Sequence, residues 1–134
     1  MNTKLFNQEE VVMVNVPPKY QAELFALKPP STHPYKRIVM FVHSLEEMKM
    51  GIVVYETQLV ENGLLIFIYP KLKNTLGIKG IHRDAIFPYL NVDETTGFVK
   101  DRTLKFNRLL KFDDDYTLVA LKKISKVKNR LLTH

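Results

Sequence analysis

Residues 51–69 read GIVVYETQLVENGLLIFIY, and this stretch decides the fold that the sequence predicts. It holds two runs of β-branched, aliphatic and aromatic residues, which are typical of strands. Between the runs stands Asn62-Gly63, the dipeptide that best tolerates the positive φ angles of a type I′ turn. The stretch therefore predicts a β-hairpin. Its second run, residues 64–69, is apolar on both faces and is expected to be a covered central strand.

The segments before this hairpin predict two helices and a strand. A helix is expected to begin near Tyr35 and to end at Gly51, because one face of this segment is apolar at helical spacing. The apolar residues are Tyr35, Ile38, Phe41, Val42, Leu45 and Met48. Nearer the N-terminus, residues 11–16 predict a short strand and residues 19–28 a short helix, each followed by a pair of prolines.

Beyond the hairpin the pattern predicts further strands and a last helix. Residues 76–81 and 103–106 are expected to be strands, and residues 86–90 a short turn or helix. From residue 113 onward, three aspartates precede apolar positions, and cations follow. Acids at the start and bases at the end of a helix oppose its macrodipole, so we expect an amphipathic C-terminal helix over residues 113–130. The predicted fold class is α+β, with an antiparallel sheet of four or more strands packed with helices.

The composition is that of one ordinary globular domain. The chain has 134 residues, of which 46% are hydrophobic, so we expect one domain over residues 1–134 with a flexible N-terminus over residues 1–9. Because it has no cysteine, disulfides, thiolate-bound zinc and cysteine nucleophiles are excluded. The apolar runs are too short to span a bilayer, and the first residues lack the apolar core of a signal peptide. We therefore expect a cytoplasmic protein with no membrane partner.

The sequence carries little that suggests catalysis. The four histidines fall in no metal-ligand spacing. In His82-Arg83-Asp84 an acid could orient an imidazole, but a short coincidence of this kind is common and is read as surface. No nucleophile–base pair or cofactor loop is visible. We therefore expect a protein that is not an enzyme and has no resident cofactor.

Two groups of carboxylates could bind a hard cation such as a metal ion. The first stands at the polar end of the helix expected before the hairpin, where a solvated helix face is the simpler explanation. The second precedes the last helix, whose N-terminus it could cap. The candidate metal ligands are Glu46, Glu47, Asp113, Asp114 and Asp115.

A second kind of site would bind anions. The chain has a net charge of +6, and its cations are concentrated in the last quarter. Gly77-Ile78-Lys79-Gly80 has the form of the GxxG loop of KH-type RNA-binding domains, in which glycines let the backbone approach a phosphate; a glycine-containing bend is the competing interpretation. The candidate nucleic-acid or anion ligands are Lys79, Lys105, Arg108, Lys122, Lys126 and Arg130.

One resemblance covers roughly residues 35–128. The order of a helix, the sequence EEMKMGI at residues 46–52, a strand pair, LGI at 76–78, TLKF at 103–106 and a lysine-rich last helix is similar to the YdhG-like family of small uncharacterised bacterial domains. This resemblance implies a compact α+β fold with an antiparallel sheet, related in general shape to frataxin. For some members it also implies an iron-chaperone role, so iron would be the cofactor that the candidate carboxylates hold.

Three functions of different classes remain open at this point. The leading one is a non-enzymatic ligand-binding or interaction domain of the YdhG-like kind, whose ligand or protein partner is unknown. The second is a nucleic-acid-associated protein, whose binding would depend strongly on salt because neutralised phosphates release counterions. The third is an enzyme, which would show a pocket with convergent polar groups.

Overall fold

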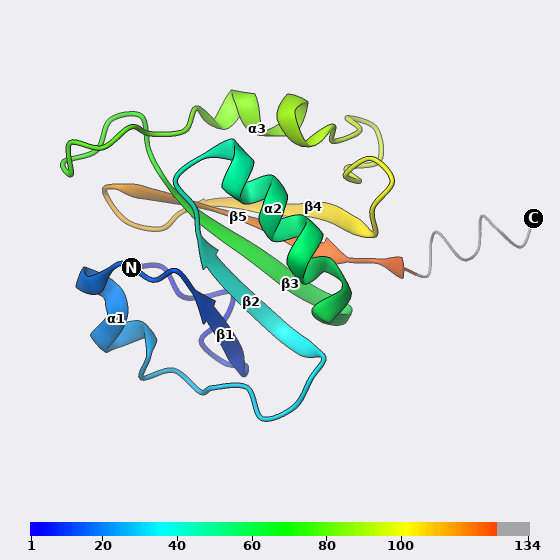
Figure 1. The fold of residues 1–134 in the computed structure, drawn as a ribbon, viewed down its shortest axis with the longest axis horizontal. Coiled ribbons are helices and arrows are strands. Elements are labelled where there is room, and N and C mark those ends of the chain that lie inside the picture. The colour runs from blue at the N-terminus through cyan, green and yellow to red at the C-terminus, as the bar shows by residue number, and fades with distance from the viewer. Residues whose placement is uncertain (126–134) are drawn as a thin grey trace, which may run out of the picture.

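The computed structural model describes residues 1–125, which form a five-stranded sheet, three α-helices and one short 3-10 helix. In chain order the elements are β1 (Val11–Val14), α1 (Pro18–Leu24), β2 (Tyr35–Phe41), α2 (Leu45–Tyr55), η1 (Glu56–Gln58), β3 (Leu59–Pro70), α3 (Arg83–Leu90), β4 (Leu104–Lys111) and β5 (Tyr116–Lys123). Figure 1 shows α2 crossing in front of the sheet, with α3 above it and α1 beside β1.

The strands follow the order β1-β2-β3-β5-β4. β1, β2 and β3 are parallel, whereas β5 is antiparallel to both of its neighbours. The α+β class is confirmed, but the sheet is mixed, so the prediction of an antiparallel sheet was wrong. β3 is the middle strand and all of residues 64–69 are buried, which confirms the covered central strand.

The hairpin predicted over residues 51–69 was wrong. Its first run belongs to α2 and η1, and the chain then enters β3 without reversing. Asn62 does adopt a positive φ, 67°, but it lies in a bulge inside one long strand. Tyr35 pairs with Leu59 and Arg37 with Leu64, so β3 accommodates three extra residues there. An Asn-Gly pair favours left-handed backbone, which suits a bulge as well as a turn.

The helix predicted from Tyr35 was wrong over its first half, where the chain forms β2. Residues 38–42 read IVMFV, and all five side chains are buried. A short run that is apolar at every position is typical of a strand covered on both faces of a sheet. The same residues also fit a helical spacing, which is the ambiguity that periodicity leaves in short apolar runs.

Helix α2 begins only after Ser44. The Ser44 Oγ accepts a hydrogen bond from the backbone N–H of Glu47 at 3.0 Å, which caps the helix. Gly51 lies inside the helix and does not end it. A Cβ atom at Gly51 would come within 2.8 Å of the Met40 sulfur, so the glycine lets α2 pack closely on the sheet.

The predicted C-terminal helix is replaced by β5 as far as the structure describes the chain. The side chains of Leu118 and Leu121 contribute to cores on opposite faces of the sheet, whereas a helix would have placed them on one face. The three aspartates form the turn between β4 and β5. The last part of the predicted helix, residues 126–130, lies outside the described residues.

Of the remaining predictions, most were confirmed and one was wrong. The strand at 11–16, the helix at 19–28 and the strand at 103–106 correspond to β1, α1 and the start of β4. Residues 86–90 lie in α3, which contains Pro88. Residues 76–81 were predicted as a strand and instead form part of a long loop between β3 and α3.

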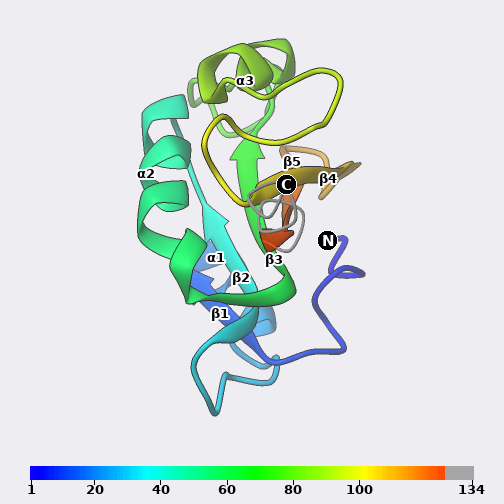
Figure 2. The ribbon, with the colours of Figure 1, turned by 90° about the vertical axis from the view of Figure 1, so that its right-hand side faces the viewer.

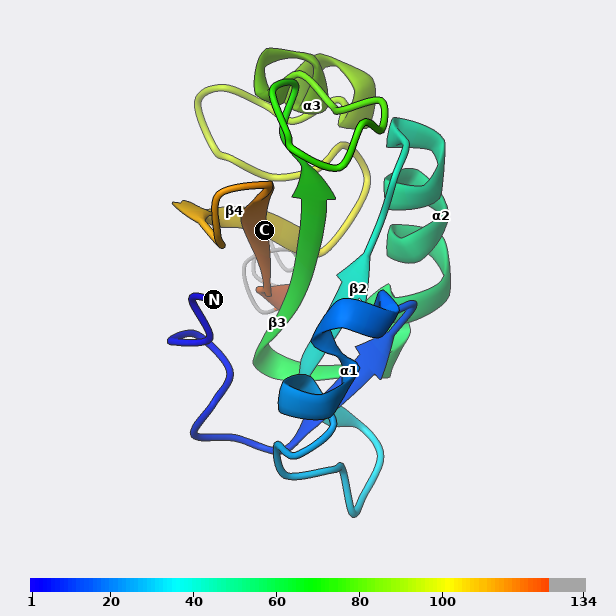
Figure 3. The same cartoon turned by 90° about the vertical axis from the view of Figure 1, so that its left-hand side faces the viewer.

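Hydrophobic cores lie on both faces of the sheet. One core receives Met48 and Ile52 from α2 and Ile86 and Leu90 from α3. The other receives Tyr20 and Leu24 from α1 and Phe6 from the N-terminal segment, together with residues of the opposite strand faces. Figure 2 shows α2 on one side of the sheet and the N-terminal segment on the other, and Figure 3 shows α1 beside β1 and β2. The chain therefore leaves β1 and β2 toward opposite faces.

Among residues 1–125 there is no helix that is both long and apolar enough to cross a membrane. The longest, α2, has 11 residues, about half the number that a bilayer requires.

Candidate ligand-binding site

The carboxyl ends of β1, β2 and β3 meet at one edge of the sheet because these strands are parallel. Three connections start there, at residues 15–17, 42–44 and 71–82, and the turn at 112–115 reaches the same edge because Tyr116 pairs with Pro70. Ligand sites of open α/β sheets lie at this edge. The chemistry of the chain is therefore sought first among these four segments.

Aromatic rings fill the part of this edge where the chain leaves β1 and β2 toward opposite faces. The rings of Tyr20 and Phe41 stack at 5.5 Å between centroids, and Phe112 and Tyr116 meet both of them edge to face. All four side chains are buried. Burial raises the pKa of Tyr20, and so does its hydrogen bond to Asp113. The phenol therefore stays protonated and acts as a donor.

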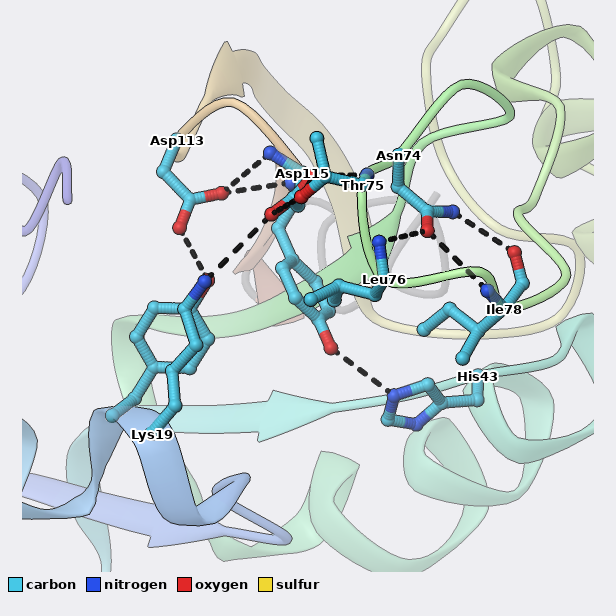
Figure 4. A network of polar contacts seen from close by, with 10 residues as sticks. Lys19, His43, Asn74, Thr75, Leu76, Ile78, Asp113 and Asp115 are labelled. Atoms are coloured by element: carbon cyan, nitrogen blue, oxygen red, sulfur yellow. Dashed lines mark hydrogen bonds and ion pairs between the residues drawn. The ribbon is translucent and has the colours of Figure 1, made fainter.

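A polar network then ties three segments together (Figure 4). Asp113 accepts a hydrogen bond from the Tyr20 hydroxyl of α1. Asp115 accepts hydrogen bonds from the Thr75 backbone N–H at 2.6 Å and from its hydroxyl at 2.9 Å, and it lies 3.7 Å from the Lys19 ammonium. The N–H of Thr75 is the main cause that holds the pKa of Asp115 below its ordinary value. The turn thus fastens the long loop to the rest of the sheet edge.

Within the loop, one amide side chain organises the backbone. Asn74 Nδ2 donates to the carbonyl oxygens of Lys71 and Ile78, both at 2.9 Å, while its Oδ1 accepts from the N–H of Leu76 at 3.0 Å. Gly80 lies so close to the start of the loop that a Cβ atom there would overlap the Lys71 carbonyl. The loop therefore folds back on itself in a defined shape.

A cavity of about 380 Å³ lies between this loop and the start of α2. It is lined by His43, Ser44, Leu45, Leu72, Lys79, Gly80, Ile81 and His82. Its volume is at the lower end of the range for small-molecule sites. The His43 ring meets the Tyr116 hydroxyl at 3.4 Å, so the cavity wall adjoins the aromatic cluster.

The candidate metal ligands do not converge. Glu47 accepts the backbone N–H of His43 at 2.6 Å, and Asp114 pairs with Lys111 at 3.0 Å, while Asp113 and Asp115 are used in the network. Within the part of the chain that the structure describes, no group of three or more His, Asp or Glu residues could hold a metal ion. These residues therefore do not fit a preformed iron site.

The candidate anion ligands fall into two separate groups. Lys79 lines the cavity. Lys105 pairs with Lys122 across β4 and β5, and Lys122 is opposite Leu64, at the other end of the sheet from the loop. Arg108 lies further along β4, and the other two candidates, Lys126 and Arg130, lie outside the described residues.

His82 and Asp84 have a structural role at the start of α3. The His82 Nδ1 accepts the backbone N–H of Asp84 at 3.1 Å, which caps the helix. The Asp84 carboxylate lies 3.8 Å from the same nitrogen and is largely exposed.

Sequence reasoning named Lys79 as an anion ligand and Glu47 and Asp115 as metal ligands, but it missed Ser44, Asn74 and Thr75, which help to shape this site. Ser44 and Glu47 carry a readable signal, because Ser-x-x-Glu at the start of a segment with apolar residues at helical spacing is typical of a helix N-terminus. Thr75 and Asp115 carry none, because their contact joins segments 40 residues apart. Asn74 bonds only to residues two to four positions away, and no motif marks it.

Comparisons with models of protein families, with curated proteins and with solved structures found no match to this chain. Its function must therefore be argued from the site itself.

Proposed function

We propose that this protein is a non-enzymatic binding domain for a small molecule, which occupies the cavity between α2 and the loop at 71–82. The single observation that supports this most strongly is the place of the cavity, at the carboxyl ends of β2 and β3. Open α/β sheets hold their ligands there, because the connecting segments diverge from the strand ends and leave room.

Two further features support the proposal. The loop that forms one wall is fixed by Asn74 and by Asp115, so the cavity exists before a ligand arrives, which lowers the entropic cost of binding. Its lining combines aliphatic side chains with a few polar groups, the composition that is usual for small-molecule sites.

The test is a fragment screen on the full chain, followed by amide chemical shifts. Ligands should change the amide chemical shifts of Ser44, Leu72 and Gly80 more than those of other residues. Leu72→Ala should weaken such ligands, because Leu72 lines the cavity, whereas Leu76→Ala in the same loop should not, because Leu76 does not line it. Fragments that bind only elsewhere, or lose equal affinity in both variants, would contradict the proposal.

Two other functions remain proposals of lower rank. Membership of the YdhG-like family, with an iron role, would require the candidate carboxylates to gather around iron. Nucleic-acid association would rest on the cations of β4 and β5, and it would show as retention on a polyanion that falls steeply with salt. Retention that is lost in Lys105→Gln and Lys122→Gln would favour this second function.

A further inference from the structure

We infer that the ligand of this cavity carries an oxyanion, a carboxylate or a phosphate, joined to a short aliphatic body. This inference rests on the proposed function and names the chemical class of the ligand. It follows from the polar atoms that the lining residues still have available and from the apolar side chains between them.

The charge of the lining is positive. Lys79 supplies an ammonium group that makes no ion pair or hydrogen bond within residues 1–125. The lining residues of the cavity, as far as the chain is described, include no carboxylate. Residues 71–83 as a whole carry four Lys or Arg and no Asp or Glu. An anion would therefore meet an unpaired cation there.

The neutral polar groups of the lining can also donate hydrogen bonds. Because His82 Nδ1 accepts the N–H of Asp84, that nitrogen carries no proton, and the neutral ring holds its hydrogen on Nε2. The Ser44 Oγ already accepts the N–H of Glu47, so its own hydrogen remains to be donated. An ammonium, a ring N–H and a hydroxyl together match a group that only accepts, such as an oxyanion.

Two carboxylates contact residues of the lining and limit where the anion can sit. Glu47 accepts the backbone N–H of His43, and so occupies the N-terminal turn of α2. Asp84 lies beside the Nδ1 of His82, the side of the ring away from Nε2. The positive charge for a ligand therefore comes from the Lys79 side of the cavity and not from the helix terminus.

The apolar lining calls for more than an inorganic ion. Leu45, Leu72 and Ile81 line the same cavity, and Leu72 is 57% exposed. Ile81 is already buried, so an oxyanion alone would leave Leu72 and the accessible part of Leu45 in contact with water. An aliphatic chain attached to it would cover them and gain the usual benefit of apolar burial.

The test compares matched ligands and matched variants. Binding of hexanoate, hexyl phosphate, hexanamide and inorganic phosphate to the full chain is measured by amide chemical shifts, as is binding to Lys79→Gln and Lys73→Gln. Lys73 is an exposed lysine of the same loop that does not line the cavity. We expect hexanoate or hexyl phosphate to bind at the cavity, and to lose about tenfold in affinity in Lys79→Gln but less than twofold in Lys73→Gln. The tighter of the two identifies the head group.

The other outcomes overturn the inference in distinguishable ways. If hexanamide binds in the cavity as tightly as hexanoate, the oxyanion is wrong while the proposed function stands. If inorganic phosphate binds as tightly as hexyl phosphate, the aliphatic part of the inferred ligand is wrong. Equal losses in the two lysine variants would mean general electrostatic attraction and no site. If no small molecule shifts the amides of the cavity, the proposed function itself fails.

Discussion

Replacing Gly80 by alanine should open the loop that forms one wall of the cavity. A Cβ atom at this position would overlap the Lys71 carbonyl and come within 2.6 Å of the Leu72 Cα, against at least 3.4 Å for ordinary contact. These are backbone atoms, so no side-chain rotation can relieve the overlap. Gly77, in the same GIKG sequence, is the matched control, because a Cβ there meets nothing within 4 Å and only its φ of 69° opposes a side chain.

The two substitutions should differ in size. Moving the first residues of the loop away from Gly80 puts at risk the hydrogen bonds from Asn74 to the Lys71 carbonyl and from the Ile81 N–H to the Pro70 carbonyl, both 2.9 Å. At about 1 kcal/mol each, with steric strain of similar size, Gly80→Ala should cost about 2–4 kcal/mol of unfolding free energy. Gly77→Ala should cost about 1–2 kcal/mol, the usual penalty for an L-residue in left-handed backbone.

Thermal unfolding followed by circular dichroism measures the difference. For a chain of this length, about 3–5 °C of Tm corresponds to each kcal/mol, so Gly80→Ala should melt about 10 °C lower and Gly77→Ala about 5 °C lower. The change in the Ser44 amide chemical shift on addition of hexanoate should vanish in Gly80→Ala and persist in Gly77→Ala. If the two variants melt together, the packing of Gly80 on Lys71 is not what shapes the loop. If both keep full stability but lose retention on RNA, GIKG is a phosphate-binding loop.

Three further predictions concern the rest of the fold and the metal. Glu56 is buried and accepts hydrogen bonds from the N–H and hydroxyl of Thr103 and from Arg102. Burial opposes ionisation of the Glu56 carboxyl, but these donors outweigh burial and lower its pKa. Glu56→Gln should therefore cost about 2–4 kcal/mol near pH 7. In urea titrations at several pH values, the difference in unfolding free energy between Glu56→Gln and the parent should shrink as pH falls below 4.5, the ordinary pKa of a glutamate. A difference that stays constant with pH would contradict this. By the same urea titration, Leu121→Ala should cost about 2–5 kcal/mol of unfolding free energy. Lys122→Gln should cost less than about 1 kcal/mol. Equal costs would place Leu121 outside the core. Anaerobic calorimetry with Fe²⁺ should detect no binding tighter than about 0.1 mM, because the candidate carboxylates are dispersed; tight binding lost in Glu47→Gln would restore the iron role.

The sequence identified segments more reliably than it identified their type. Residues 64–69 were recognised as a central strand because a run that is apolar at every position has few other uses in a domain of this size. The run at 38–42 has the same character, yet the sequence predicts a helix there because the flanking residues Tyr35, Leu45 and Met48 continue a spacing of three and four. The capping pair Ser44 and Glu47 marks the boundary that periodicity alone cannot place.

At the C-terminus, charge misled the prediction. Acids before an apolar run and bases after it fit a helix with its dipole opposed, but the same order arises when a turn is built by aspartates and the next strand ends at the surface. Asp113 shows this, because its Oδ1 accepts the N–H groups of Asp115 and Tyr116 at 2.9 Å each and so forms the turn. The spacing of Leu118 and Leu121 suits a helix only if the two residues between them, Val119 and Ala120, are exposed. Val119 and Ala120 are instead buried.

The position of the cavity follows from contacts that no local pattern encodes. Tyr20 reaches Asp113, 93 residues away, and their neighbours fill the edge between β1 and β2 with aromatic rings. Asp115 of the same turn holds Thr75, 40 residues away, and thereby fixes the loop over the end of β3. Space for a ligand remains on the α2 side of that loop, where Lys79 stands without a partner among the described residues. Ligand affinity and loop order should therefore change together, because the turn that closes the aromatic cluster is also the one that sets the wall of the cavity.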